Sequence, residues 1–290
     1  FNSYTIMPLS RKKRTSLFRQ LVEKEWSEYY WEFVLKYSDK LDWNGISSNP
    51  NITIEFIEKY PDKLWNWNGG ISRNPNITME FIEKYSNKPW NWYYISYNTN
   101  ITMEFIEKYP DKPWDWYNIS YNPNISIAII EKYPDKEWHW NQISYNPNIT
   151  MDIIEKYPNK PWSWYGISKN PNITMDIIEK YPDKPWYWTG ISCNPNITMD
   201  IIEKYPDKPW NFYCISNNPN ISMEFIEKYP DKPWSWYNIS RNPNITINLL
   251  EKNLYNPWDW HAISQNPFNY EKELFIEKRM KEYLASYRIQ

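Results

Sequence analysis

Few residues in this 290-residue chain have the type and spacing that catalysis requires. His139 and His261 are the only histidines, and neither has a catalytic motif around it. Cys193 and Cys214 are the only thiols, and two thiols without a histidine make a poor metal-ligand set. No phosphate-binding loop, dinucleotide fingerprint or nucleophile elbow occurs. We therefore expect a non-enzymatic protein without cofactor or metal.

A glycosylation acceptor pattern, Asn-Ile-Thr or Asn-Ile-Ser, recurs along the chain. Nothing indicates a secretory route, because Phe1 to Arg14 has no apolar core like that of a signal peptide. An Asn-Pro-Asn turn followed by a Thr or Ser that caps a helix explains the same tripeptide without sugar. With only two cysteines and therefore no disulfide framework, the default compartment is reducing and cytosol-like, and we expect no secretion.

Charge and hydropathy exclude two broad classes of partner. The formal net charge of −2 gives no general attraction to nucleic acid or anionic lipid. No apolar run approaches the roughly 18 residues of a membrane span, so we expect no membrane insertion. Arg11, Lys12, Lys13 and Arg14 form a basic run, which is either a nuclear signal or, as we favour, a solvated start. The 20 Trp and 24 Pro indicate a structural demand for large rigid side chains and fixed φ angles.

The dipeptide Ile-Ser marks an internal repeat. It begins at positions 46, 71, 95, 119, 143, 167, 191, 215, 239 and 263, so every spacing is 24 residues except the first, which is 25. These are nine complete units, with a degenerate half-unit over 29–43 before them. Repeats of this length indicate a solenoid, in which each unit buries its apolar face against its neighbours.

The residues of each unit are numbered from the Ile of Ile-Ser, so that Ile119 is at unit position 1. The sequence of each unit predicts two short helices separated by prolines. The first is clearest at Thr102 to Tyr109, with Thr102 as N-cap and Phe105, Ile106 and Tyr109 on one face. The second is expected to start at Asp-Lys-Pro, with Pro113 in its first turn, and to run to the next Asn-Pro. Ten layers at about 8–10 Å each would form an elongated rod or arc of roughly 80–100 Å.

The predicted fold class is therefore an all-α solenoid of helix-turn-helix repeats. A leucine-rich-type α/β solenoid is the alternative, because its repeats run 20–29 residues with an Asn at a fixed offset from apolar positions. Trp114, Ile119 and Asn122 match that pattern, whereas other places in it do not. We divide the chain into an N-terminal segment with a capping half-repeat (1–45), the tandem repeats (46–267) and a C-terminal capping helix (268–290).

Comparison of the units shows that positions 21, 24 and 3 vary most, while position 23 is mostly Tyr. The three variable positions are spaced i, i+3, i+6 and would form one stripe of the second helix. We expect this stripe to bind a partner, although freely drifting solvent positions remain the alternative. The stripe comprises Arg73, Asn91, Tyr94, Tyr97, Asp115, Asn118, Tyr121, His139, Gln142, Tyr145, Lys169, Tyr187, Asn217, Asn238 and Arg241.

A protein partner is the leading expectation, because extended faces of solenoids bind in this way. Nucleic acid is the alternative, since some helical repeats read one base per unit and aromatic side chains stack on bases. Each typical unit, however, carries Glu, Glu and Asp against two Lys, which leaves no basic track for phosphates.

The block Asn-Pro-Asn-Ile-Thr-Met-Glu-Phe-Ile-Glu-Lys-Tyr-Pro-Asp-Lys-Pro-Trp-x-Trp, repeated over 43–267, resembles the Trp- and Pro-rich tandem-repeat proteins of large DNA viruses. The resemblance implies a viral origin and a place in the virion or the host cytoplasm. It supplies no site residues. A virion structural or minor capsid-associated component is thus one form that the expected scaffold could take.

Overall fold

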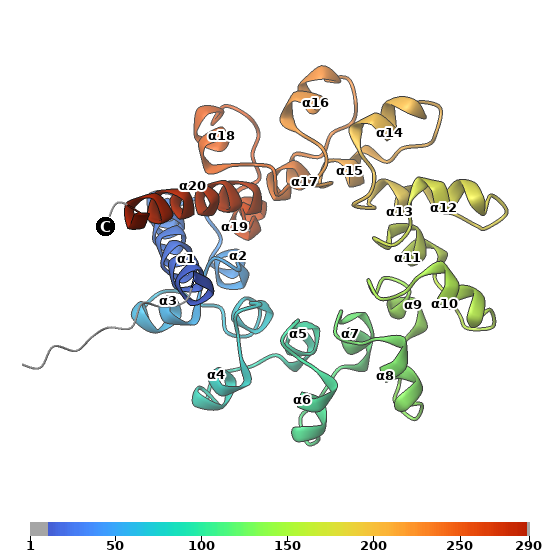
Figure 1. Cartoon of the computed structure of the whole chain (residues 1–290), viewed down its shortest axis with the longest axis horizontal. Coiled ribbons are helices and arrows are strands. Elements are labelled where there is room, and N and C mark those ends of the chain that lie inside the picture. Colours follow the sequence, from blue (N-terminus) through green and yellow to red (C-terminus); the bar gives the residue numbers. More distant parts are fainter. Residues whose placement is uncertain (1–10, 289–290) are drawn as a thin grey trace, which may run out of the picture.

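The computed structural model describes residues 11–288, and the regular elements in that range are all helices (Figure 1). This confirms the all-α solenoid. The leucine-rich-type alternative is wrong, because it requires a strand in every repeat and residues 11–288 contain none.

Each unit places its first helix in an outer layer. In α6 the Oγ1 of Thr102 accepts a hydrogen bond from the backbone N–H of Phe105 at 3.3 Å, so the predicted cap is confirmed. The helix ends at Lys108, before Pro110. The outer helices are α3 (Ile54–Lys59), α4 (Met79–Lys84), α6 (Met103–Lys108), α8 (Ile127–Lys132), α10 (Met151–Lys156), α12 (Met175–Lys180), α14 (Met199–Lys204), α16 (Met223–Lys228) and α18 (Ile247–Lys252).

The second helix of each unit lies in an inner layer, and it starts later than the sequence predicts. In α7 the N-cap is Asp115, whose carboxylate accepts from the N–H of Asn118 at 2.8 Å. Trp114 stays extended, because its indole N–H donates to the carbonyl of Tyr109 at 2.8 Å. The inner elements are α2 (Trp43–Ser48), the 3-10 helix η1 (Ile71–Arg73), α5 (Trp92–Tyr97), α7 (Trp116–Tyr121), α9 (Trp140–Ile143), α11 (Trp164–Lys169), α13 (Trp188–Ser192), α15 (Phe212–Ile215), α17 (Trp236–Arg241) and α19 (Trp260–Gln265).

A ladder of buried polar side chains joins each unit to the one before it. The Asn at unit position 4 donates its side-chain amide to backbone carbonyls of the preceding unit, as Asn146 does to Asn122 and Ile125, both at 2.9 Å. The Ser at position 2 accepts from the backbone N–H at position 21, which caps the next inner helix, as Ser120 does from His139 at 2.9 Å. Both side chains are buried, so the ladder fixes the stacking of the units.

The array closes on itself, and the expected elongated rod is therefore wrong (Figure 1). Asn49 in the first unit donates to the carbonyls of Ser264 at 3.1 Å and Asn266 at 2.9 Å in the last unit. The N–H of Asp42 donates to Ser264 Oγ at 2.7 Å. These bonds repeat those between internal units, so α2 follows α19 as any inner helix follows its predecessor. The sum of the rotations between units, which no single residue encodes, completes a full turn.

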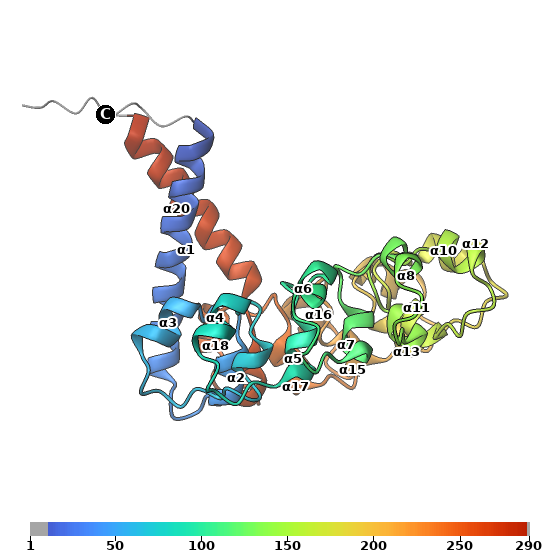
Figure 2. The ribbon, with the colours of Figure 1, turned by 90° about the horizontal axis from the view of Figure 1, so that it is seen from below.

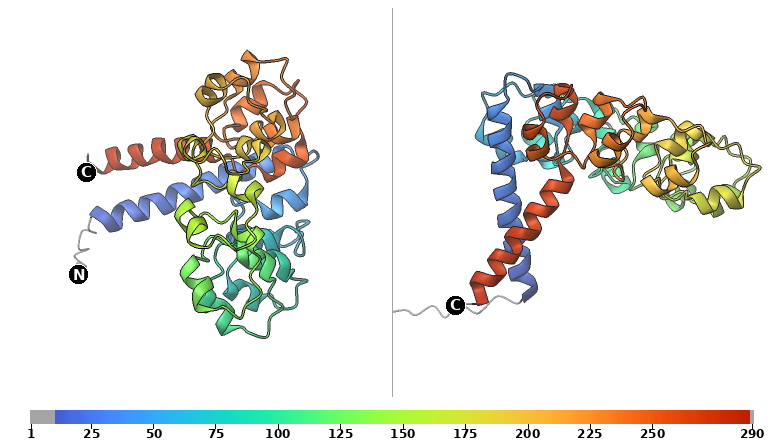
Figure 3. Two further views of the ribbon diagram at one scale, coloured as in Figure 1. Left: turned by 90° about the vertical axis from the view of Figure 1, so that its right-hand side faces the viewer. Right: turned by 90° about the horizontal axis from the view of Figure 1, so that it is seen from above.

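The two terminal helices are paired with each other and leave the plane of the ring together (Figures 2 and 3). They are α1 (Arg11–Lys36) and α20 (Asn269–Arg288), and the latter is the helix that the sequence predicts within 268–290. Arg279 donates to the Glu25 carboxylate at 2.7 Å, and the Tyr283 hydroxyl donates to it at 2.5 Å. Because the ring has no free ends, these helices do not cap opposite ends of a stack. The division at 45 and 267 stays a prediction.

The last turn of α1 also acts as the outer helix of the degenerate half-unit that precedes the first unit. Lys36 pairs with Glu251 at 2.7 Å, as Lys84 pairs with Glu58 at 2.7 Å between internal units. The degenerate half-unit that the sequence shows thus completes a ring of ten pairs of outer and inner elements within residues 11–288.

Candidate binding surface of the ring

The inner elements expose one side that the outer helices do not cover, and we call it the inner face. The Ile at unit position 1 is buried throughout the ring. The side chains at positions 23 and 3 are instead exposed or half-buried, as Tyr117 and Tyr97 show with 39% and 45% of their surface exposed. Positions 23 and 3 are four residues apart, and one helix face therefore carries both.

From η1 to α13 the inner face is aromatic, and we call this part the aromatic arc. Tyr97 and Tyr121 stack with ring centroids 5.2 Å apart and planes inclined by 17°. Tilted and edge-on ring contacts extend this pair through further tyrosines: Tyr121 to Tyr145 at 6.1 Å, Tyr145 to Tyr165 at 6.2 Å and Tyr165 to Tyr187 at 6.3 Å. Arg73 lies over the ring of Tyr94 with 4.3 Å to its centroid, and Tyr117 contacts the ring of His139 at 5.4 Å.

Burial raises the pKa of two tyrosine hydroxyls on the aromatic arc, those of Tyr97 and Tyr145. Burial, together with the neighbouring Tyr121, raises the pKa of Tyr97, which outweighs the opposite effect of Arg73. Burial, followed by the nearby Tyr165 and Tyr117, raises the pKa of Tyr145. The aromatic arc therefore offers neutral hydroxyls and ring faces, and the charges among the predicted residues there are Arg73, Asp115 and Lys169.

From α13 through α19 to α2 the inner face is mainly polar, and we call this part the polar arc. Its position-3 residues include Asn217, Arg241 and Gln265. Tyr213, with 57% of its surface exposed, stacks on no ring within residues 11–288. Cys193, directly after α13, and Cys214 of α15 form a disulfide. An intact disulfide argues against the expected reducing compartment.

The predicted stripe is split by the structure. Position 24 lies at the junction of units, where the amides of Asn118 and Asn238 are buried and donate to the carbonyls of Tyr93 at 2.9 Å and Tyr213 at 2.6 Å. Position 21 is the N-cap, a role filled by the side chains of Asn91 and Asp115 but not by those of His139 and Tyr187.

The rest of the stripe lies at position 3 on the inner face. Arg73, Tyr97, Lys169, Asn217 and Arg241 are exposed there, and Tyr121 and Tyr145 are half-buried. The remaining position-24 residues, Tyr94 and Gln142, are half-buried. The sequence comparison missed position 23, since its tyrosines vary little. Its spacing of four residues from position 3 would have indicated the shared face.

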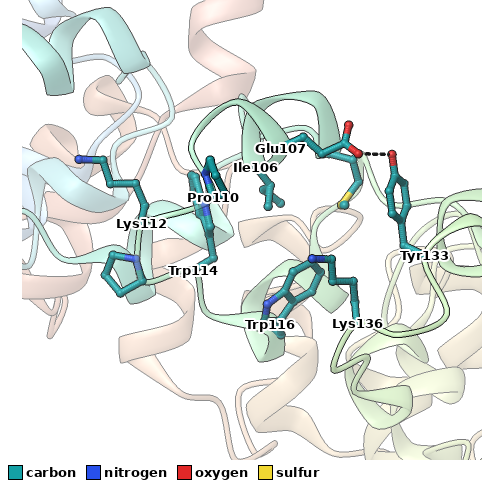
Figure 4. Close-up of a pocket in the computed structure, with 10 residues that line it drawn as sticks. Ile106, Glu107, Pro110, Lys112, Trp114, Trp116, Tyr133 and Lys136 are labelled. Atoms are coloured by element: carbon teal, nitrogen blue, oxygen red, sulfur yellow. Dashed lines mark hydrogen bonds between the residues drawn. The ribbon is translucent and has the colours of Figure 1, made fainter.

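Grooves also open between neighbouring outer hairpins, and Figure 4 shows the one beside α6. It has a volume of about 470 Å³ and a floor that includes Ile106, Trp114 and Trp116. Contacts between units cross it: the Tyr133 hydroxyl donates to Glu107 at 2.7 Å, and the Lys136 ammonium lies 5.2 Å from the Trp116 ring centroid. Four further grooves repeat this arrangement. We assign them to the junctions between units.

The residues considered for catalysis lie apart or are bound in structural contacts. His139 and His261 are both exposed, and His261 Nδ1 lies 3.1 Å from Asp42 across the ring closure. The searched part of the chain holds no group of three His, Cys, Asp or Glu side chains suited to a metal ion. The sequon asparagines use their amide nitrogen in the framework, as Asn76 does toward the carbonyls of Pro50 at 2.8 Å and Ile52 at 2.9 Å.

Two further findings concern the basic run and the membrane. Lys12 is exposed, and the side chains of Arg11, Lys13 and Arg14 lie outside those that the structure describes, so the interpretation of this run stays a prediction. Within the described residues, every helix is too short or too polar to cross a lipid bilayer.

Comparisons of the chain with models of protein families, with curated proteins and with solved structures found no match.

Proposed function

We propose that this chain is a non-enzymatic repeat scaffold that binds a protein partner through the aromatic arc. The observation that carries the proposal is the continuous row of tyrosine ring contacts from Tyr97 to Tyr187, part of which is exposed to solvent. Tyr and Arg dominate the binding energy of protein interfaces, because they bury large rigid surfaces and also form hydrogen bonds. Exposed aromatic surface on a rigid ring costs little conformational entropy on binding.

The chemistry of the arc favours a partner segment with apolar or aromatic side chains and few charges. Arg73 and Lys169 are balanced in part by Asp115, so the arc gives little electrostatic attraction to a strongly acidic or basic ligand. Tyrosine hydroxyls with raised pKa remain donors at neutral pH and can bond to peptide carbonyls.

The test is recovery of partners from infected cells by two matched variants. Replacement of Tyr97, Tyr121 and Tyr145 by Ala should remove a partner that the unchanged chain recovers. Replacement of Asn217, Arg241 and Gln265 by Ala on the polar arc should leave recovery intact. Circular dichroism should show equal helicity in both variants. Equal recovery by the two would count against the aromatic arc.

Binding of single-stranded nucleic acid is the second candidate, because stacked tyrosines resemble the aromatic platforms on which bases stack. The aromatic arc has few cationic side chains to bind phosphates, which argues against nucleic-acid binding. A titration with mixed single-stranded DNA and RNA at falling salt concentration separates the two candidates. No binding at low salt eliminates nucleic acid, whereas binding that weakens steeply with salt would favour it.

The resemblance to viral repeat proteins supports a place in the virion or in the infected cell, with a virion structural component as one form of the scaffold. The Cys193–Cys214 disulfide favours a compartment or particle in which thiols oxidise. Fractionation of purified virions and infected cells, followed by immunodetection of the chain, tests this location.

A further inference from the structure

The point at which the ring closes differs from every other junction in one respect: the chain does not continue across it. We call the junction between α19 and α2 the seam. Internal neighbours are joined both by the Asn and Ser ladder and by the polypeptide. At the seam only the non-covalent contacts remain, so this is where the ring can open without unfolding a unit.

The seam reproduces most of the hydrogen bonds of the internal junctions. Across it, Asn49 donates to two carbonyls of the last unit at 3.1 and 2.9 Å. Asn74 donates to the corresponding carbonyls of its own predecessor at 3.0 and 3.1 Å. The Lys40 ammonium lies 4.9 Å from the Trp260 ring centroid, and Lys88 lies 4.8 Å from that of Trp67. The face of α19 therefore packs on the face of α2 in the same head-to-tail way as the inner helices of any two neighbouring units.

A head-to-tail interface does not require that its two faces belong to the same molecule. We propose that the seam faces bind a second copy of this chain, so that two opened rings join head to tail and close as one ring of twice as many units. In this dimer α19 of each copy packs on α2 of the other. Every hydrogen bond of the seam is made again, now between molecules.

The terminal helices fit the same exchange. Arg279 and Tyr283 of α20 hold Glu25 of α1, and Phe18 stacks on Tyr283 with centroids 5.4 Å apart. Because α1 precedes α2 and α20 follows α19, an exchanged seam brings α20 of one copy beside α1 of the other. The ion pair is therefore retained. The larger ring also needs only half the rotation between units, which brings neighbouring outer hairpins closer together.

Closure within one molecule competes with this exchange. The two faces of one chain meet at a high effective concentration, so the single ring dominates when the protein folds in dilute solution. A second copy wins only when folding takes place at high protein concentration. Once formed, the dimer dissociates slowly, because both seams must open together.

The native disulfide supplies a matched way to lock the seam. Cys193 is at unit position 3 and Cys214 at position 24 of the same unit. The equivalent positions across the seam are Gln265 and Gly45. A Cβ atom on Gly45 would lie 3.2 Å from Gln265 Cγ and 2.6 Å from Ser264 Cβ, so the Ser264 side chain must shift to admit it. The double variant Gly45→Cys with Gln265→Cys should therefore form a disulfide that ties the first unit to the last.

The experiment refolds the full chain from denaturant at increasing protein concentration and measures molar mass by light scattering. For the unchanged chain we expect a species of twice the monomer mass whose share increases with refolding concentration and persists after dilution. The oxidised locked ring should remain monomeric throughout, and its reduced form should dimerise again. A chain that is monomeric at every concentration, or a locked ring that dimerises equally, would overturn the proposal.

A second pair of variants covers failure of the locked ring to fold. One copy carries Gly45→Cys alone and the other Gln265→Cys alone, and the two are refolded together at high concentration and then oxidised. An exchanged seam predicts a covalent dimer that contains one of each. Absence of the mixed dimer, or equal amounts of covalent dimer from each copy refolded alone, contradicts it.

Discussion

The two arcs of the inner face share one framework and differ in what holds their exposed side chains. On the aromatic arc, tyrosine rings contact one another in an unbroken row from Tyr97 to Tyr187. The polar arc lacks such a row and instead contains the disulfide and the seam. The buried Asn and Ser ladder continues through both arcs. The difference shows that stacking of the units is independent of the residues on the inner face, which leaves those residues free to serve binding.

The largest expected effect tests whether the framework is the same in both arcs. Asn146→Ala removes two side-chain hydrogen bonds to carbonyls of the preceding unit in the aromatic arc, and Asn242→Ala removes three in the polar arc. The carbonyls of Asn122 and Ile125 keep other donors at 3.0 and 3.2 Å. A hydrogen bond contributes about 1 kcal/mol net, so each variant should lose about 3 kcal/mol of unfolding free energy. Urea denaturation measures the loss. Exposed Asn217→Ala is the control and should change stability by less than about 0.5 kcal/mol.

A clear inequality between Asn146→Ala and Asn242→Ala would contradict the common framework. It would mean that the tyrosine contacts, or the disulfide, contribute part of the stability that we assign to the Asn and Ser ladder.

The next effect belongs to the polar arc alone. Replacement of Cys193 and Cys214 by Ser removes a cross-link between residues 21 apart in sequence. A disulfide that closes a loop of this size contributes about 3 kcal/mol, chiefly by restricting the unfolded chain. Denaturation with and without reductant measures it. Reductant should destabilise the unchanged chain by the same amount and leave the double variant unaffected, and an unaffected parent chain would argue that the pair is not bonded in solution.

The sequence predicts the parts of this fold that depend on local signals. The period, the outer helix and its cap at Thr102 follow from proline positions, apolar spacing and capping chemistry within about ten residues. The sequence predicts a start of the inner helix that is too early, at Pro113, because the choice of the N-cap residue depends on packing outside the helix. Asp115 is the N-cap, because Trp114 lies outside the helix and donates its indole N–H to the Tyr109 carbonyl.

Ring closure and the burial of position 24 depend on contacts between units, and the sequence does not encode them locally. A variable position is usually exposed to solvent, yet the residue at position 24 packs against neighbouring side chains. A Cβ on Gly166 would come within 2.9 Å of the Tyr145 ring, so a small residue at position 24 makes room for a large one at position 3 of the same unit.

A smaller difference in stability is expected when a tyrosine is replaced on each arc. Tyr121→Leu removes stacking with both Tyr97 and Tyr145 and should cost about 1 kcal/mol, since aromatic pairs contribute about 0.5–1.5 kcal/mol beyond burial. Tyr213→Leu on the polar arc removes an exposed ring without a stacking partner in the described range, and should be nearly neutral. Thermal unfolding of both variants measures the difference. Equal losses would show that the stack does not stabilise the aromatic arc.

The smallest effect concerns the ion pair that accompanies the seam. Hydrogen bonding from Arg279, aided by Tyr283, lowers the pKa of Glu25 despite the opposing effect of burial. A carboxyl group with a lowered pKa in the folded state stabilises that state above its ordinary pKa of about 4.5. This contribution disappears as the pH falls through the lowered value. The unchanged chain should therefore lose more thermal stability between pH 6 and pH 3 than Glu25→Gln does.

The comparison with Glu25→Gln isolates one group, because other carboxyls also titrate in this range. Glu271, whose pKa burial raises, changes stability with the opposite sign in both proteins and cancels in the difference. If the two proteins lose stability in parallel, the ion pair adds nothing to the folded ring, and the seam is held by the Asn and Ser ladder alone. If they diverge, acid weakens the polar arc at its seam while the aromatic arc, which has no such pair, keeps its stack.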